Sequence, residues 1–161
     1  MSASFVVGMK FEETGRQLQA LTPLKEGDGE GFVDTGSGWS WIAGSESGAL
    51  ERDGVTAEGR SLGVNKTAGN LQIFGTGVKS LRGSKNLAVE SSVPIDLSMN
   101  SADLGTTITF YTLRNTTLKL TLPRKPATGL LDGRLIHNGF QGTSVVLKEI
   151  GQGEHILRVH Y

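Results

Sequence analysis

The chain contains only two tryptophans, Trp39 and Trp41, which stand two residues apart in a segment rich in glycine and serine. In an extended segment this spacing places both rings on one face. Aromatic rings stack on the apolar faces of sugars, while neighbouring polar groups hydrogen-bond the hydroxyls. We therefore predict a platform for an oligosaccharide or polysaccharide, with Asp34, Arg60 and Asn65 as its hydrogen-bonding neighbours. The alternative is that either tryptophan fills the core, as large aromatics in β-sandwiches do.

A second candidate is a cation site in the glycine-rich segment that precedes the tryptophans. Asp28 and Glu30 are spaced by two residues there. Calcium takes carboxylate and carbonyl oxygens from irregular loops of this kind. The segment lacks the repeated Asp/Asn ladder of a dedicated calcium motif, so solvated loop charges are the competing interpretation. No other cofactor is expected.

Catalytic motifs are missing from the sequence. It has no cysteine, no Gly-x-Ser-x-Gly elbow, no phosphate-binding loop and no His-Glu-x-x-His pair. His155 and His160 are five residues apart, which places them on opposite faces of a regular strand. An enzyme would therefore need a general acid and a general base from distant strands. A glycan hydrolase or a glycan lyase can be built in this way. The candidate groups for such a dispersed site are Glu12, Asp34, His137, Arg158, His160 and Tyr161.

The elements that must position these side chains are strands. In Thr116–Leu122, Leu118, Leu120 and Leu122 alternate with polar residues, which indicates one buried and one wet face. Gly105–Leu113 alternates in the same way, with Ile108 and Phe110 expected to face inward. Arg114-Asn115 between the two segments predicts the turn of an antiparallel hairpin.

The C-terminal part continues with short alternating segments, in which Val145 and Leu147 are expected to face inward and the Asp132-Gly133 dipeptide predicts a tight turn. Leu157, Val159 and Tyr161 share one face of the last of them, so we expect the chain to end inside a sheet. Helix signals are confined to a turn or two at Arg16–Leu21 and a short irregular helix at Ile95–Leu104. The further expected strands are Ser4–Phe11, Phe32–Asp34, Trp39–Ala43, Ser61–Asn65, Leu71–Phe74, Asn86–Val89, Ala127–Leu131, Arg134–His137, Gly142–Lys148 and Glu154–Tyr161. The predicted fold is all-β, an antiparallel, jelly-roll-like β-sandwich that forms a single domain over residues 1–161.

The composition of the chain limits the classes of function that it can have. Sixteen basic and sixteen acidic side chains give no net charge, which argues against a nucleic-acid partner. No apolar stretch is long enough to span a membrane as a helix. Glycine is abundant, with 23 residues, and many of them lie between Gly27 and Gly83. We interpret that region as short strands separated by turns.

Two groups of segments suggest a family. Gly36-Ser-Gly-Trp-Ser-Trp41, Gly59–Val64 and Pro94–Leu97 before Thr106–Phe110 resemble concanavalin-A-like, or laminin-G-like, jelly rolls found beside bacterial glycan-active enzymes. The tail, from Leu130–Arg134 through Gly142–Leu147 to Gly153–Val159, is similar to the closing hairpins of accessory β-sandwiches in polysaccharide lyases and glycoside hydrolases. The resemblance implies a β-sandwich accessory domain and transfers no ligand residue.

The leading functional hypothesis is a non-catalytic carbohydrate-binding or accessory module of a secreted, glycan-active protein. We expect an extracellular or cell-surface location, reached as an excised or signal-processed domain. Two alternatives stay open. One is a structural jelly-roll domain of a viral, phage or other assembly, which would form a symmetric oligomer. The other is a glycan lyase or hydrolase with a dispersed active site. The oligomeric state is left open.

Overall fold

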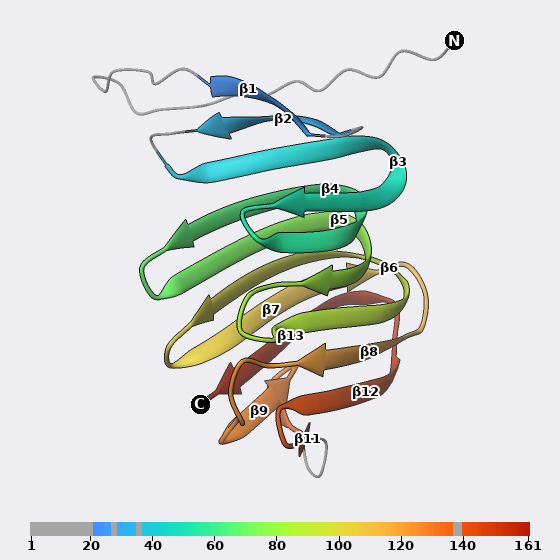
Figure 1. The fold of residues 1–161 in the computed structure, drawn as a ribbon. Coiled ribbons are helices and arrows are strands. Elements are labelled where there is room, and N and C mark those ends of the chain that lie inside the picture. Colours follow the sequence, from blue (N-terminus) through green and yellow to red (C-terminus); the bar gives the residue numbers. More distant parts are fainter. Residues whose placement is uncertain (1–20, 27–28, 35–36, 137–139) are drawn as a thin grey trace, which may run out of the picture.

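The computed structural model describes residues 21–26, 29–34, 37–136 and 140–161, and within these ranges every regular element is a strand paired in antiparallel fashion (Figure 1). The prediction of an all-β, antiparallel β-sandwich is confirmed. The strands are β1 (Leu21–Glu26), β2 (Gly29–Asp34), β3 (Trp39–Arg52), β4 (Val55–Thr67), β5 (Asn70–Arg82), β6 (Ala88–Ala102), β7 (Gly105–Thr112), β8 (Thr116–Thr121), β9 (Thr128–Leu131), β10 (Arg134–Leu135), β11 (Phe140–Gln141), β12 (Ser144–Ile150) and β13 (Gly153–His160).

Four long strands build the sandwich by bending from one layer into the other. The ladder between β3 and β4 breaks between Ala43 and Gly48, and Figure 1 shows β3 turning back on itself there. The ladders of β4 with β5 and of β5 with β6 break in the same middle region. Each of these strands therefore contributes one half to each layer, which gives the sandwich its rolled, jelly-roll-like form.

We call the two layers A and B. Layer A contains, in order of pairing, β1, β2, the first half of β3, the second half of β4, the first half of β5, the second half of β6, β7, β13, β9 and β10. Layer B contains the remaining halves of β3 to β6, followed by β8, β12 and β11. The layers diverge at β6, which pairs with β8 through Ser91 and with β7 from Ile95 onward.

One hydrophobic core fills the space between the layers. Its members come from both halves of the bent strands and from the C-terminal strand, as Ile42, Leu50 and Leu157 illustrate. The alternating stripes that the sequence predicted all face this core. They are Leu118, Leu120 and Leu122; Ile108 and Phe110; Val145 and Leu147; Leu157 and Val159. Burial of these side chains is the main force that holds the layers together.

The glycine-rich region differs from its prediction of short strands. Six of its glycines lie inside strands of 13 and 14 residues, at or near the points where the ladders break, namely Gly44, Gly48, Gly59, Gly63, Gly75 and Gly77. Gly77 has a φ of 61°, a left-handed conformation that allows the extra residues of a bulge to leave the ladder. On β6, Pro94 lies in the matching gap, where no ladder hydrogen bond from its nitrogen is required. The glycines inside these strands lie where the strands bend, whereas Gly54 and Gly69 occupy the turns between them.

Two further predictions about local structure are wrong. The expected helix at Ile95–Leu104 is the second half of β6 and the turn that follows it, because alternate residues Ile95, Leu97 and Met99 are buried with a period of two. The expected hairpin of Gly105–Leu113 with Thr116–Leu122 does not form. Both segments are strands, but β7 pairs with β6 and β13, whereas β8 pairs with β6 and β12.

Candidate functional site

Trp39 and Trp41 lie on the outer face of layer A. Their neighbours Ser40 and Ile42 point inward and are 2% and 1% exposed, so the alternation of the strand turns both tryptophans away from the core. Both indole rings are partly exposed, and neither belongs to the buried core. Their ring centroids are 6.3 Å apart, with a tilt of 34° between the planes. The predicted common face is therefore observed, and the core alternative is wrong for both.

A third aromatic residue extends this surface. Trp41 is paired with Gly63 of β4, and Gly63 with Phe74 of β5, so the three positions lie side by side on the outer face. Gly63 has no Cβ, and a Cβ there would lie 2.9 Å from Trp41 Cε2. The indole ring therefore lies across the glycine and reaches Phe74, at a centroid distance of 5.1 Å. We call Trp39, Trp41 and Phe74 the aromatic strip.

Sequence reasoning did not find Phe74. It stands beside Ile73 in an apolar run, and nothing in the sequence shows which of the two faces the core. The available signal was Gly63, a glycine inside a strand, which often marks a place where a ring or a backbone approaches closely. Recognising it required knowing that β3, β4 and β5 are neighbours.

Asp34 and Asn65 support the turn that leads into Trp39. Asp34 accepts hydrogen bonds from Ser37 Oγ at 2.6 Å and from the Ser37 amide at 3.4 Å. Asn65 Nδ2 donates to the Ser37 carbonyl at 2.9 Å, and only 9% of the Asn65 residue is exposed. Both residues are also paired with Trp39 in register, on either side of it. They therefore lie beside the aromatic strip, and their described hydrogen bonds hold Ser37 in the turn that precedes Trp39.

Arg60 lies at the bend of β4, beside a shallow groove. Its aliphatic stem runs along Gly77, and the groove of about 290 Å³ is also lined by Thr76, Asp96 and Tyr111. Thr76 follows Phe74 by two residues on β5, so it lies on the same face, about 7 Å further along the strand. The arginine is thus at the far end of the aromatic face and not next to Trp39.

The described residues form no cation site at the predicted calcium ligands, Asp28 and Glu30. Asp28 lies outside the described residues. Glu30 is exposed and its carboxylate is 3.8 Å from Lys25 Nζ on the neighbouring strand. In the described part of the chain, no group of three or more acidic, histidine or cysteine side chains could hold a metal ion.

Among the candidate residues for a dispersed catalytic site, those that the structure describes do not lie together. Asp34 on β2 is separated from Arg158 and His160 on β13 by five intervening strands, or nearly 30 Å at the usual strand spacing. Tyr161 follows on the opposite face, where its hydroxyl is 2.7 Å from Thr106 Oγ1. Glu12 and His137 lie outside the described residues.

His155 and Asp132 form a titratable pair that the sequence did not predict. His155 Nδ1 lies 2.8 Å from Asp132 Oδ2, and His155 Nε2 lies 2.9 Å from the Gly151 carbonyl oxygen. Partial burial acts to lower the pKa of His155, but the hydrogen bonds to Asp132 and Gly151 and the charge of Asp132 outweigh it and raise this pKa. Burial acts to raise the pKa of Asp132, but hydrogen bonds from His155 and the Ile156 amide outweigh it and lower this pKa.

This pair lies at the turn between β9 and β10. Asp132 and Gly133 form the tight turn that the sequence predicted, with φ values of 52° and 76°. The pair ties that turn to β13, which indicates a structural role.

The chain matches no protein-family model and no curated protein sequence. No helix in the described ranges is long and apolar enough to cross a membrane.

Proposed function

We propose that the outer face of layer A binds a carbohydrate, and that the chain is a non-catalytic binding or accessory module acting outside the cell. The aromatic strip carries this proposal. Trp39, Trp41 and Phe74 form a continuous row of partly exposed rings on a sheet face that also carries polar side chains, and Phe32 of β2 is paired with Trp41 beside this row. Sugars need this combination, because their rings have apolar faces and hydroxyl edges.

Polar side chains border the aromatic strip on both sides. Pairing places one row of them across layer A, starting next to Trp39, and a second row beyond Phe74 toward the groove at Arg60. The first row contains Asn65, Gln72, Asn100 and Thr107, and the second contains Ser61 and Thr76. Ser61 Oγ and Thr76 Oγ1 are 2.8 Å apart, so these hydroxyls are positioned by each other. A sugar stacked on the rings would have hydrogen-bonding groups along both edges.

The tilt of the rings narrows the class of ligand. Trp41 is inclined by 34° to Trp39 and by 47° to Phe74, so no flat surface can contact all three rings at once. A single glycan chain can rotate about its glycosidic bonds and present successive rings at different angles. The geometry therefore favours a soluble, single-chain polysaccharide or oligosaccharide over a crystalline one.

Binding to a glycan array, followed by titration calorimetry with the soluble hits, tests the proposal. We expect Trp39→Ala, Trp41→Ala and Phe74→Ala each to weaken binding by about tenfold or more, because each removes buried apolar contact with a sugar ring. Val146→Ala is the matched control, since Val146 is an exposed apolar residue of layer B.

Absence of any glycan binding by the unmodified chain would refute the function. Binding that all three substitutions leave unchanged would refute the site. Stronger binding to crystalline than to soluble polysaccharide would contradict the ligand class.

A further inference from the structure

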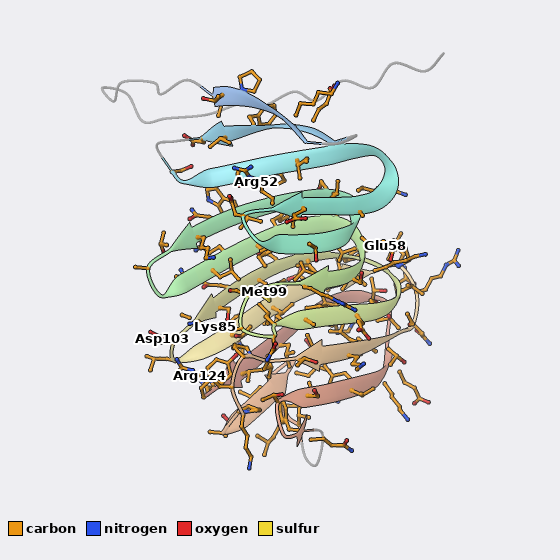
Figure 2. The ribbon with its side chains drawn as sticks, viewed as in Figure 1. Arg52, Glu58, Lys85, Met99, Asp103 and Arg124 are labelled. Carbon is orange, nitrogen blue, oxygen red and sulfur yellow. The ribbon has the colours of Figure 1, made fainter. Side chains whose placement is uncertain are left out.

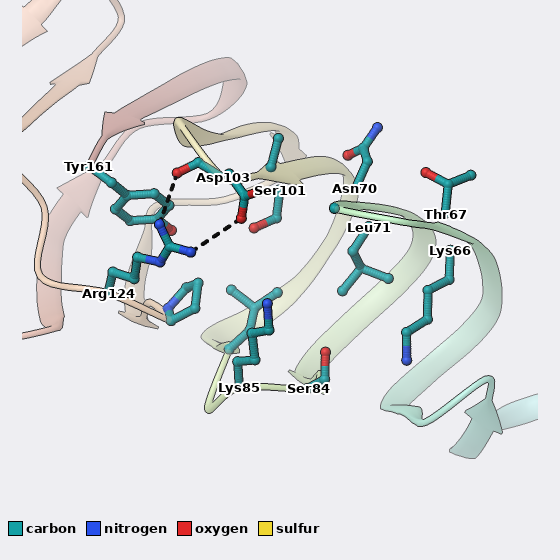
Figure 3. Close-up of a pocket in the computed structure, with 14 residues that line it drawn as sticks. Lys66, Thr67, Asn70, Leu71, Ser84, Lys85, Ser101, Asp103, Arg124 and Tyr161 are labelled. Carbon is teal, nitrogen blue, oxygen red and sulfur yellow. Dashed lines mark hydrogen bonds and ion pairs between the residues drawn. The ribbon is translucent and has the colours of Figure 1, made fainter.

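A pocket at one end of the sandwich gathers positive charge. It has a volume of about 140 Å³ and is lined by the β4–β5 turn, the loop between β5 and β6, the β6–β7 turn, the segment after β8 and Tyr161. Lys66, Lys85 and Arg124 reach it from three different segments, and Asp103 is the one acidic side chain in its lining (Figure 3). Figure 2 shows Lys85, Asp103 and Arg124 at this end of the molecule, with Glu58 at the opposite end.

The cations of this pocket are only partly neutralised. Arg124 donates to the Asp103 carbonyl at 3.3 Å and to its carboxylate at 3.2 Å. Among the residues that the structure describes, Lys66 and Lys85 form no ion pair. Two unpaired ammonium groups beside one internal ion pair leave a net positive potential at the pocket, which attracts an anion.

Lys85 is held at the rim in a costly backbone conformation. Lys85 and Asn86 have φ values of 56° and 64°, and the Leu87 amide donates to the Ser84 carbonyl at 3.2 Å. These are the features of a two-residue hairpin turn whose positions are usually glycine, asparagine or aspartate. A lysine is unfavourable at the first of these positions, and residues held in such conformations occur often at binding sites.

Asn70 begins β5 directly after the β4–β5 turn and lines the pocket. Asn70 Oδ1 is buried and has no hydrogen-bond partner in the described structure. Because this oxygen has almost no accessible surface, the groups that the pocket offers to a ligand are the ammonium groups of Lys66 and Lys85.

We propose that this end pocket binds the acidic end of a saccharide residue, through a carboxylate or a sulfate group. Its volume is close to that of cavities that hold one six-membered ring of about six heavy atoms. The pocket can therefore take the charged end of a single sugar, with the remainder of the ring outside. The proposal rests on the proposed carbohydrate function for the source of the ligand, whereas the affinity of the pocket for the acidic group does not depend on the aromatic strip.

Backbone amide chemical shifts, followed by NMR during titration, test the proposal with three probes. Sodium glucuronate and sodium sulfate supply the two acidic groups, and glucose is the neutral control, all at one ionic strength set with chloride. We expect both anions, or one of them, to shift amides of residues that line the pocket, with millimolar dissociation constants. A response to one anion alone identifies the acidic group. Equal shifts with glucose, or no shifts with either anion, would overturn the proposal.

A double variant, Lys66→Gln with Lys85→Gly, locates the binding. Glycine accepts the φ of 56° at position 85, so we expect the fold and melting temperature to be kept. The dissociation constant should rise about tenfold or more, as expected for the loss of charge-assisted hydrogen bonds. Lys79→Gln with Lys148→Gln is the matched control, because both lysines are exposed and lie outside the pocket. Anion binding that survives in the pocket variant would overturn the assignment.

A third variant separates this inference from the proposed function. Trp41→Ala should weaken binding of neutral glycans and leave the shifts caused by glucuronate or sulfate unchanged. If Trp41→Ala abolishes the response to the anions, they bind at the aromatic strip and the end pocket is not a separate site. If no glycan binds but the anions still act through Lys66 and Lys85, the proposed function fails and the pocket stands as an oxyanion site.

Discussion

Ser40 Oγ donates a hydrogen bond to Asp53 Oδ2 over 2.5 Å, although Ser40 is the second residue of the strand β3 and Asp53 directly follows its last residue. The contact exists because β3 bends back on itself, so that its first half lies in layer A and its second half in layer B. Ser40 is 2% exposed, whereas the side chain of Asp53 keeps 38% of its surface exposed. The bond therefore ties the two layers together at the strand that carries both tryptophans.

Removing this hydroxyl should loosen the connection between the layers. We expect Ser40→Ala to lower the free energy of unfolding by about 1 kcal/mol, because the lost donor is partly replaced by water at the exposed carboxylate. Urea denaturation measures the change. Ser98→Ala, an exposed serine of β6, is the control and should stay within about 0.5 kcal/mol. Equal effects of the two substitutions would contradict a structural role for the Ser40 bond.

The position of Trp41 should depend on the absence of a side chain at Gly63. A Cβ at that position would meet the indole ring at 2.9 to 3.2 Å, so Gly63→Ala must displace the ring or its neighbours. We expect weaker carbohydrate binding, although no atom that contacts the sugar is removed. Gly151→Ala is the control, because its added Cβ would meet nothing within 4 Å. Calorimetry and a tryptophan fluorescence spectrum check the prediction, and unchanged values in both would contradict it.

The His155–Asp132 pair should make stability depend on pH. The raised pKa of His155 means that its contribution is fully present below the unfolded value of about 6.5 and is lost as the pH rises through the higher folded pKa. The lowered pKa of Asp132 means that its contribution is present above the unfolded value of about 3.8 and is lost as the pH falls through the lower folded pKa. The pair should therefore stabilise the fold most between about pH 4 and 6.5.

Thermal unfolding across this pH range tests the pair. We expect His155→Gln to remove most of the decrease in melting temperature between pH 6 and 8 that the pair causes. His160→Gln is the matched control, because His160 is exposed on the outer face of β13. A pH profile that His155→Gln leaves unchanged while His160→Gln alters it would refute the assignment.

The C-terminal strand should be indispensable for folding. β13 lies between β7 and β9, and Leu157 and Val159 are 0% and 2% exposed. Deletion of residues 157–161 removes these side chains and leaves two strand edges without a partner, so we expect an insoluble or unfolded chain. Leu157→Ala is the milder test and should cost about 2 to 5 kcal/mol of stability. Arg158→Ala, on the exposed face, serves as the control; a soluble deletion variant with an unchanged melting temperature would show that the segment is dispensable.

The local pattern of residue types was sufficient to predict strands, their faces and turns, because these features depend only on residues that are neighbours in the sequence. The side chains of a strand alternate with a period of two, so the leucines at 118, 120 and 122 identified both a strand and its buried face. The same rule placed Trp39 and Trp41 together, and the Asp132-Gly133 dipeptide identified its turn, because glycine and aspartate tolerate left-handed backbone.

Only the tertiary structure decided which strands are partners, because ladder hydrogen bonds are made by the backbone and are nearly independent of sequence. Two consecutive alternating segments, β7 and β8, therefore resembled a hairpin although they entered different layers. For the same reason the sequence determined that Trp41 shares a face with Trp39, but not that this face points outward or that Phe74 is the neighbour of Trp41 across Gly63. The end pocket depends wholly on pairing, since Lys66, Lys85 and Arg124 meet only when β4, β5 and β8 are placed in the sandwich.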